Sequence, residues 1–310
     1  MIRKVIIVSA SRAEKGLLKP VMNELQNRQE AIGDIQPIWY EFNCEDFPHK
    51  MLRDWEAFLK NYSQSNTMIL FPTDRPEMTY LASYAFNNGF LICHFHAGDF
   101  GSEHPDEMNR RAISCFSHIL FCNDLSSQTA LWRLGEERWR TFCVGSTAFD
   151  FLEIDESWCP SFDYDLVLLH PDPISEEATR KDVKAAFETV KDSGRAVVWL
   201  APNHDRHYEV IVDFVKSQFS KDKLWAYYTN LPRSQFLGLL KNCQCCVGNS
   251  SSFTYELPYI NPKAKLIKIG LRNKDRNQPS KIAIGGSKKI AEILATIPLD
   301  DKLRRKRLVV

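Results

Sequence analysis

The sequence predicts an α/β protein made of two Rossmann-like domains, and three observations lead to this prediction. Short apolar runs alternate with helical segments from one end of the chain to the other. The alternation restarts after residue 150, and 310 residues suit two domains of ordinary size. Polar or glycine-containing clusters follow the apolar runs. We therefore expect two parallel sheets, each with helices on both faces, that face a central cleft.

The expected elements follow from the apolar runs and the segments between them. Strands are expected in the first half at 4–9, 36–42, 68–71, 91–96, 118–122 and 139–144, and in the second half at 164–170, 196–201, 223–228, 244–247 and 265–269. Helices are expected between them, for example over 51–61, 77–88, 124–134, 176–193, 206–219 and 232–242. The stretch 153–160 is acidic and contains a proline, as linkers often do. We therefore expect an N-terminal domain over 1–155 and a C-terminal domain over 156–310 that ends in a helix and a basic tail.

Composition argues against several classes of protein. The net charge is +1, so no overall field draws the chain to nucleic acid or to a membrane. No apolar run approaches the ~18 residues that cross a bilayer, and residues 1–8 are typical of a buried strand rather than a signal peptide. The nine cysteines lie mostly in apolar strands, which indicates buried thiols and a cytoplasmic protein. The basic tail at 302–307 is expected to be a solvated chain end, with a phosphate-backbone contact as the alternative.

The sequence predicts no metal site. Residues 243–246 read Cys-Gln-Cys-Cys, and no second cysteine pair lies at zinc-finger spacing. His94, His96 and His104 are conceivable ligands, but histidines at strand ends more often serve as polar site residues.

The most informative segment runs from Cys245 to Glu256. An apolar strand leads directly into Gly-Asn-Ser-Ser-Ser at 248–252, and a helix-like segment then begins. Such a turn leaves backbone N–H groups and hydroxyls beside one another, which suits an anion such as phosphate. Glu256 follows one turn later and could accept hydrogen bonds from a vicinal diol such as ribose. The competing interpretation is a capped helix start without a ligand, because serine and asparagine are ordinary N-caps.

Other polar clusters also fall where parallel strands end. Ligands of open parallel sheets bind beyond the carboxyl ends of the strands, so we expect these clusters to line one site. In chain order they are 9–12, 73–75, 94–99, 145–146, 170–171, 202–205, 248–251 and 270–272.

The order of these clusters resembles that of a known family. The matching segments are Ser9–Glu14, Asp74-Arg75, His94–Asp99, Asp106–Arg110 with Ser117-His118, Val144–Ser146, His170-Pro171, Pro202–Asp205, Gly248–Glu256, and Gly270–Arg272 with Arg276. Together they resemble the hydrolysing UDP-N-acetylglucosamine 2-epimerases over nearly the whole chain. The resemblance implies the GT-B architecture and a UDP-sugar substrate. The reaction of this family requires neither a metal nor a redox cofactor, and its members are often oligomers.

The resemblance also implies roles for individual residues. The acid–base carboxylates around the sugar would be Asp74, Asp99 and Asp106, with Arg110 orienting Asp106. His170 would reach the diphosphate or the leaving oxygen. The nucleotide would be held by the serine-rich turn, by Glu256 on the ribose, and by two arginines near the phosphates. These binding residues are Arg12, Gly248, Asn249, Ser250, Ser251, Ser252, Glu256 and Arg272.

Each catalytic assignment has a structural alternative. Asp74 could form a surface pair with Arg75, and His170 could simply end a strand. Asp106 could cap a helix that begins near Met108, and Asp99 could be a turn residue. Arg110 could be an ordinary charge on a helix face.

The chain resembles a divergent and shortened member of the family. Its first half is short before Asp74, so a lid or loop is expected to be absent, and it also departs from the family pattern at single positions. Phe253 stands where glycine is common and is expected to narrow the approach to the nucleotide or to stack on another group. Arg206-His207 stand where small residues are usual, and Asp99 replaces a frequent glutamate. These changes leave a second hypothesis open: a GT-B glycosyltransferase that moves the sugar to a hydroxyl acceptor, for example a hydroxymethylated base in DNA. Only this alternative would involve nucleic acid. A third alternative is a sugar-nucleotide sensor without activity.

Overall fold

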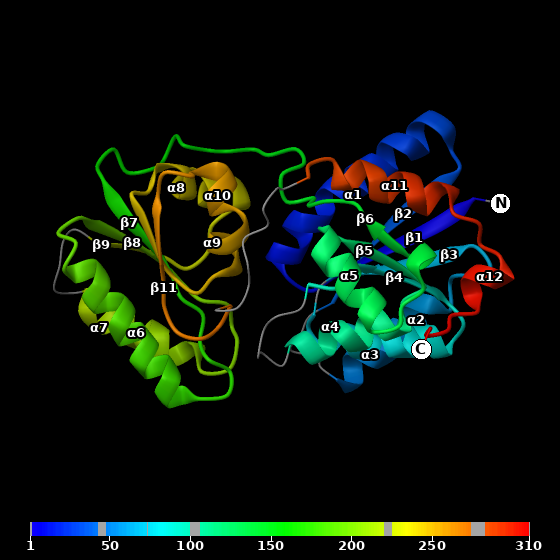
Figure 1. Ribbon diagram of the computed structural model, residues 1–310, viewed down its shortest axis with the longest axis horizontal. Coiled ribbons are helices and arrows are strands. Elements are labelled where there is room, and N and C mark those ends of the chain that lie inside the picture. The colour runs from blue at the N-terminus through cyan, green and yellow to red at the C-terminus, as the bar shows by residue number, and fades with distance from the viewer. Residues whose placement is uncertain are drawn as a thin grey trace. The chain divides into compact units, whose positions relative to one another are not determined.

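The computed structural model describes residues 2–42, 48–72, 74–99, 106–219, 225–273 and 283–309. The chain forms two compact units, each built around one parallel sheet (Figure 1). Unit 1 comprises Met1–Phe100, Pro105–Phe151 and Lys281–Val310, and unit 2 comprises Gly101–His104 and Leu152–Ser280. The predicted α/β architecture with two parallel sheets is confirmed.

Unit 1 contains a six-stranded parallel sheet in the part of the chain that the structure describes, with the order β2-β1-β3-β4-β5-β6. Its strands are β1 (Arg3–Ser9), β2 (Ile35–Glu41), β3 (Thr67–Phe71), β4 (Leu91–Phe95), β5 (Ile119–Cys122) and β6 (Thr141–Cys143). The helices between them are α1 (Arg12–Ile32), α2 (His49–Leu59), α3 (Pro76–Asn87), α4 (Asp106–Phe116) and α5 (Leu125–Arg133).

The central strands of unit 1 are buried on both faces, which explains their continuous apolar runs. Along β1, Val5 and Ile7 join the core beneath α1, whereas Ile6 and Val8 join the core beneath α2 and α3. Successive side chains of a strand point to opposite faces, so one apolar strand serves both cores.

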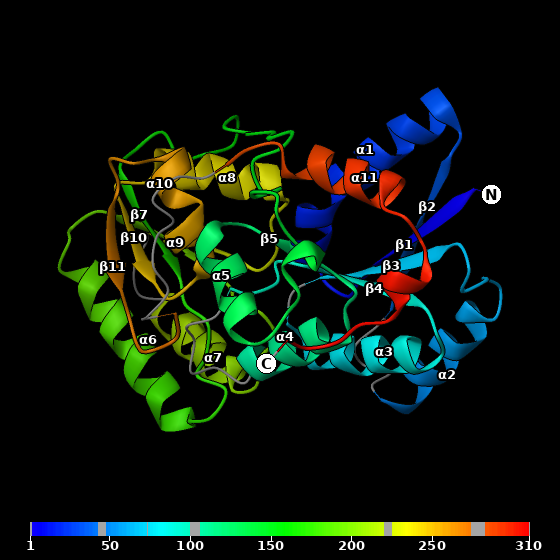
Figure 2. The same ribbon diagram turned by 45° about the vertical axis from the view of Figure 1, so that its right-hand side comes forward.

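The end of the chain returns to unit 1, which corrects the predicted domain over 156–310. Helix α11 (Gly286–Thr296) lies beside α1 (Figures 1 and 2), and its Ile290 and Leu294 are fully buried in the same core as Val5 and Ile7. The chain leaves unit 1 after Phe151, close to the expected boundary at 155. The sequence pattern did not reveal this return, because an amphipathic helix does not specify which sheet it covers.

The basic tail is anchored, whereas the sequence led us to expect a solvated chain end. The fully buried guanidinium of Arg140 donates hydrogen bonds to the carbonyls of Leu303 (2.7 Å) and Arg305 (3.0 Å), at the end of the short helix α12 (Asp301–Arg304). The Lys306 ammonium donates to the Glu136 carboxylate (2.8 Å) and to the Ser114 carbonyl of α4 (2.6 Å). The tail therefore fastens α12 and α4 within unit 1.

Unit 2 contains a five-stranded parallel sheet within the described residues, with the order β11-β10-β7-β8-β9. Its strands are β7 (Tyr164–Leu168), β8 (Ala196–Leu200), β9 (Trp225–Tyr228), β10 (Cys245–Gly248) and β11 (Lys265–Lys268). Helices α6 (Glu176–Lys191) and α7 (Tyr208–Phe219) pack on one face, and α8 (Arg233–Asn242), α9 (Ser251–Tyr255) and α10 (Leu257–Ile260) pack on the other.

We predict that His118 makes the stability of unit 1 dependent on pH. Burial, followed by the charges of Arg140 and Lys306, lowers the pKa of His118 to about 3, and its Nδ1 accepts a hydrogen bond from the Ile92 N–H (3.1 Å). The unfolded chain binds a proton at this histidine below its ordinary pKa near 6.5, whereas the folded protein does not. The free energy of unfolding should therefore fall by ~2 kcal/mol through this residue between pH 7 and pH 5.

The test is urea denaturation of the wild type and His118→Asn at several pH values. Asparagine keeps an acceptor for the Ile92 N–H but does not titrate. The difference in unfolding free energy between the two proteins should shrink as the pH falls from 7 to 5. A constant difference over this range would show that His118 is not the titrating group.

Candidate functional site

The first candidate cluster lies at the carboxyl ends of the strands of unit 1. Asp74 follows β3, Asp99 follows β4, and Arg110 lies on α4. Only 3% of Arg110 is exposed, and its guanidinium donates to the carboxylate of Asp74 and to the backbone carbonyl of Asp99. The structure thus brings together three residues that the sequence places far apart. A guanidinium next to a carboxylate favours its ionised form, which is the form that accepts protons.

This arrangement bears on two of the sequence-based interpretations. Arg110 was expected to orient Asp106, and the structure pairs its guanidinium with the carboxylate of Asp74. Arg75, the neighbour with which Asp74 could pair at the surface, contacts Glu77 (3.3 Å). Asp106 is the first residue of α4, where the helix dipole favours a carboxylate. Sequence order alone could not choose among these carboxylates, because every strand end reaches the same edge.

The turn after β1 adds a carboxylate that the sequence analysis did not single out. Ser11 and Glu14 form a capping box at the start of α1, in which one Glu14 oxygen accepts from the N–H groups of Ala10 (2.8 Å) and Ser11 (2.9 Å). The other Glu14 oxygen has no partner among the described residues. Burial raises the pKa of Glu14, and these hydrogen bonds and the charge of Arg75 oppose the shift. Arg12 opens α1, but its side chain lies outside the described part of the structure.

The histidines of the His94–Asp99 segment are polar core and turn residues. His94 is fully buried, and its Nδ1 lies 2.9 Å from the Ser114 hydroxyl. His96 stacks on Phe95 with ring centroids 3.9 Å apart. Over the described ranges, no group of three or more histidine, cysteine or acidic side chains is placed to hold a metal ion, and His104 lies outside these ranges.

The second candidate cluster lies in unit 2, where β10 ends in the serine-rich turn. Gly248 has φ 146°, and a Cβ there would lie 2.0 Å from the Leu168 carbonyl of β7. Only glycine allows the two strands to approach so closely at this point. Ser250 is the N-cap of α9 and accepts a hydrogen bond from the Ser252 N–H (3.3 Å), and Ser251 is the first helical residue. The expected turn between strand and helix is therefore present.

Asn249 organises this cluster by clamping the backbone of His170. Its side-chain oxygen accepts from the His170 N–H (2.7 Å), and its side-chain nitrogen donates to the His170 carbonyl (2.9 Å). The Asn273 side chain in turn donates to the Asn249 carbonyl (2.7 Å). Asn249 was predicted to bind nucleotide, and the structure shows it holding another predicted site residue. Asn273 was missed, because a single asparagine beyond a strand carries no sequence signal.

The His170 imidazole is held in one tautomer. Its Nδ1 accepts a hydrogen bond from the Asn203 N–H (3.3 Å), so the proton of the neutral ring lies on Nε2. Burial, and secondly the charge of Arg272, lower the pKa of His170 to about 3, while Asp205 opposes the shift. Arg272 itself donates to the Asp205 carboxylate (2.9 Å) and to the Pro171 carbonyl (3.1 Å). His170 therefore presents an N–H donor rather than a charged imidazolium.

Glu256 lies at the junction of α9 and α10 and is 5% exposed. One carboxylate oxygen accepts a hydrogen bond from Arg233, and the other has no partner among the described residues.

Phe253 was expected to narrow the approach to the nucleotide. This expectation is wrong, because the ring is 1% exposed and packs in the core with Leu257.

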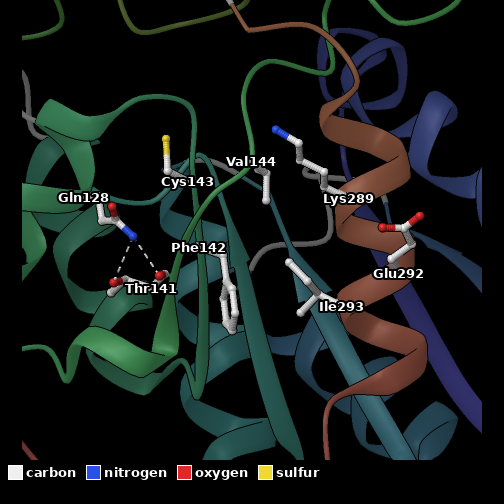
Figure 3. Close-up of a pocket in the computed structure, with 8 residues that line it drawn as sticks. All are labelled: Gln128, Thr141, Phe142, Cys143, Val144, Lys289, Glu292 and Ile293. Atoms are coloured by element: carbon white, nitrogen blue, oxygen red, sulfur yellow. Dashed lines mark hydrogen bonds between the residues drawn. The ribbon is translucent and has the colours of Figure 1, made fainter.

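A pocket elsewhere in unit 1 contains none of these residues. It has a volume of about 370 Å³ and lies between the edge strand β6 and helix α11 (Figure 3). Its lining residues are Gln128, Thr141, Phe142, Cys143, Val144, Lys289, Glu292 and Ile293. The candidate site is therefore defined by its polar contacts and not by this pocket.

Comparisons with known proteins show the family. Residues 44–306 match the family model described as UDP-N-acetylglucosamine 2-epimerase. A GDP/UDP-N,N'-diacetylbacillosamine 2-epimerase (hydrolyzing) of Campylobacter jejuni is 26% identical over 88% of this chain and 82% of the relative. A UDP-N-acetylglucosamine 2-epimerase of Neisseria meningitidis is 24% identical over 90% of this chain and 83% of the relative.

Solved structures show the same fold. The crystal structure of UDP-GlcNAc 2-epimerase from Neisseria meningitidis bound to UDP-GlcNAc has a TM-score of 0.75 at 16% identity, covering 94% of this chain and 99% of that chain. The S. aureus MnaA–UDP structure has a TM-score of 0.73 at 14% identity, covering 98% of this chain and 90% of that chain. In the described residues, no helix is long and apolar enough to cross a membrane.

We predict that Asn249→Asp destabilises unit 2. The substitution keeps the acceptor for the His170 N–H but places a carboxylate oxygen against the His170 carbonyl in place of the amide donor. The expected loss is ~1–3 kcal/mol of unfolding free energy, measured by urea denaturation. Asn203→Asp makes the same chemical change at an exposed side chain and should stay within ~0.5 kcal/mol of the wild type. Equal effects of the two substitutions would contradict the clamp.

Proposed function

The chain belongs to the UDP-N-acetylglucosamine 2-epimerase family, and from this membership we propose that it is a hydrolysing 2-epimerase of a UDP-linked 2-acetamido sugar. The observation that carries the proposal is the buried Arg110, which joins Asp74 and Asp99 at the carboxyl edge of the unit 1 sheet. A reaction that moves a proton on carbon needs an ionised carboxylate in a fixed position. The contact with Arg110 holds Asp74 in position, and a neighbouring guanidinium favours the ionised form of a carboxylate.

The reaction has two stages. A base removes the proton at C2 of the sugar, the electron pair forms the C1=C2 double bond, and the C1–O bond breaks towards UDP. Water then adds its hydroxyl to C1 and a proton returns to C2 from the opposite face, which yields the free 2-epimer. We assign the first proton transfer to Asp74, and Asp99 and Asp106 are the candidates for returning the proton.

Unit 2 would hold the leaving group. Ser250 and Ser251 present hydroxyls beside the N–H groups of the turn, and Glu256 faces the ribose. Arg272 and the Nε2–H of His170 would contact the diphosphate. Hydrogen-bond donors and positive charge at this position stabilise the negative charge that develops on the departing UDP.

The substrate class follows from the relatives. Two of their names specify hydrolysing 2-epimerases of UDP-N,N'-diacetylbacillosamine, and a third specifies a UDP-N-acetylglucosamine 2-epimerase. Both sugars are UDP-linked and N-acetylated. We propose UDP-N-acetylglucosamine, with N-acetylmannosamine as the product, as the first substrate to test. Neither these relatives nor the family model favour transfer to an acceptor such as DNA.

Product analysis tests the proposal. The protein is incubated in D₂O with UDP-N-acetylglucosamine and, separately, with UDP-N,N'-diacetylbacillosamine, without an acceptor. Mass spectrometry and NMR should find UDP and the free 2-epimer, with one solvent deuterium at C2. No turnover of either UDP-sugar, or a free sugar without deuterium at C2, would contradict the proposed reaction.

Asp74→Asn tests the assignment of the base. The amide keeps the size of the side chain but cannot take a proton, so kcat should fall ~10²–10⁴-fold. UDP affinity, measured by calorimetry, should stay near that of the wild type, because Asp74 is not among the proposed UDP contacts. Asp54→Asn is the matched control, since Asp54 is exposed on α2 of the same unit. Full activity of Asp74→Asn would show that another group is the base.

A further inference from the structure

Arg233 was not assigned to the site from the sequence, but it contacts Glu256, which was. Arg233 is the first residue of α8 and follows Pro232, whose carbonyl accepts from the N–H groups of Gln235 (3.1 Å) and Phe236 (3.0 Å). The guanidinium donates to the Glu256 carboxylate. The Arg233 side chain is 31% exposed and that of Glu256 is 6% exposed, so a partly accessible cation lies against a buried anion.

The position of Arg233 on its helix indicates that the contact is specific. A cation in the first turn of a helix lies at the positive end of the helix dipole, where it is disfavoured. The first turn of α8 contains no acidic residue that would offset this effect. The carboxylate that compensates Arg233 comes from Glu256, 23 residues further along the chain.

The backbones that carry the two side chains are fixed. Leu237 and Leu240 of α8 share a core with Phe253 and Leu257, which flank Glu256. Glu256 itself closes α9, since its N–H donates to the Ser252 carbonyl (2.8 Å), and its carbonyl accepts from the Ile260 N–H of α10 (2.9 Å). The packing of α8 against α9 and α10 therefore holds Arg233 and Glu256 next to each other.

The contact leaves Glu256 with one engaged and one free oxygen. Arg233 binds Oε1, whereas Oε2 is buried and has no hydrogen-bond partner among the described residues. A buried carboxylate oxygen without a partner carries an unrelieved desolvation cost, so a hydroxyl that reaches it gains a strong, charge-assisted hydrogen bond. A ribose hydroxyl fits this chemistry.

We propose that Arg233 is a positioning residue for the ribose, which fixes the Glu256 carboxylate so that Oε2 is presented to a hydroxyl of the nucleotide. The inference rests on the proposed binding of UDP by unit 2. It assigns Arg233 no contact with the phosphates. Loss of Arg233 should therefore weaken recognition of the ribose hydroxyls and leave recognition of the diphosphate unchanged.

Calorimetry with three probes tests this role: UDP, 2',3'-dideoxy-UDP and inorganic pyrophosphate. The wild type should bind UDP about tenfold or more tightly than the dideoxy analogue, as expected for a hydrogen bond to a charged group. In Arg233→Met this ratio should fall to about threefold or less, with the affinity for pyrophosphate unchanged. Arg233→Lys should restore part of the ratio, because it returns a cation to the carboxylate.

Glu256→Gln and the double variant complete the test. Glu256→Gln should lower the same ratio, and adding Arg233→Met to it should cause little further loss, because both changes remove one interaction. Additive losses, an unchanged ratio in Arg233→Met, or an equal loss of pyrophosphate affinity would each overturn the role of Arg233. If the wild type does not bind UDP, the proposed function fails as well. Thermal unfolding shows whether Arg233→Met is folded, and if it is not, the ratios of Arg233→Lys and Glu256→Gln decide.

Discussion

The parallel direction of the strands is the constraint on which both candidate clusters depend. Within each unit every strand ends at the same edge of the sheet, so polar residues far apart in the sequence are delivered to one place. Backbone direction alone does not align their side chains. In unit 1 the alignment comes from Arg110, which spans from Asp74 to Asp99, and in unit 2 it comes from Asn249, which binds both backbone groups of His170.

The sequence predicted the α/β fold and the position of the strands because each strand is an apolar run ended by a glycine or a polar cluster. It placed the boundary between the units within a few residues. It assigned α11 to the wrong unit, because the apolar stripe of Ile290 and Leu294 would suit any open sheet face. The tail was also misjudged. Its basic residues are typical of a solvated end, and the buried partners of Lys306 become visible only in three dimensions.

The residues of the candidate site were predicted better than their interactions. Gly248 and Asn249 were recognised as parts of a turn, but the structure shows them in contact with other parts of unit 2. Gly248 permits a close approach of two strands, and Asn249 holds the backbone of His170. Asn273 and Arg233 carry no local pattern, and each acts on a residue more than twenty positions away. Phe253 shows the opposite error, since a bulky ring beside a ligand turn can point into the core instead.

The two clusters also differ in charge, and this difference matches the division of labour in the proposed reaction. Unit 1 contributes carboxylates, one of which is paired with a buried guanidinium and is the proposed base for proton transfer at carbon. Unit 2 contributes hydrogen-bond donors and a neutral His170 whose proton lies on Nε2, as a departing diphosphate requires. A neutral donor stabilises UDP without binding it as tightly as an imidazolium would. Because the His170 ring gives up no proton in this role, the return of a proton to C2 is left to the carboxylates of unit 1.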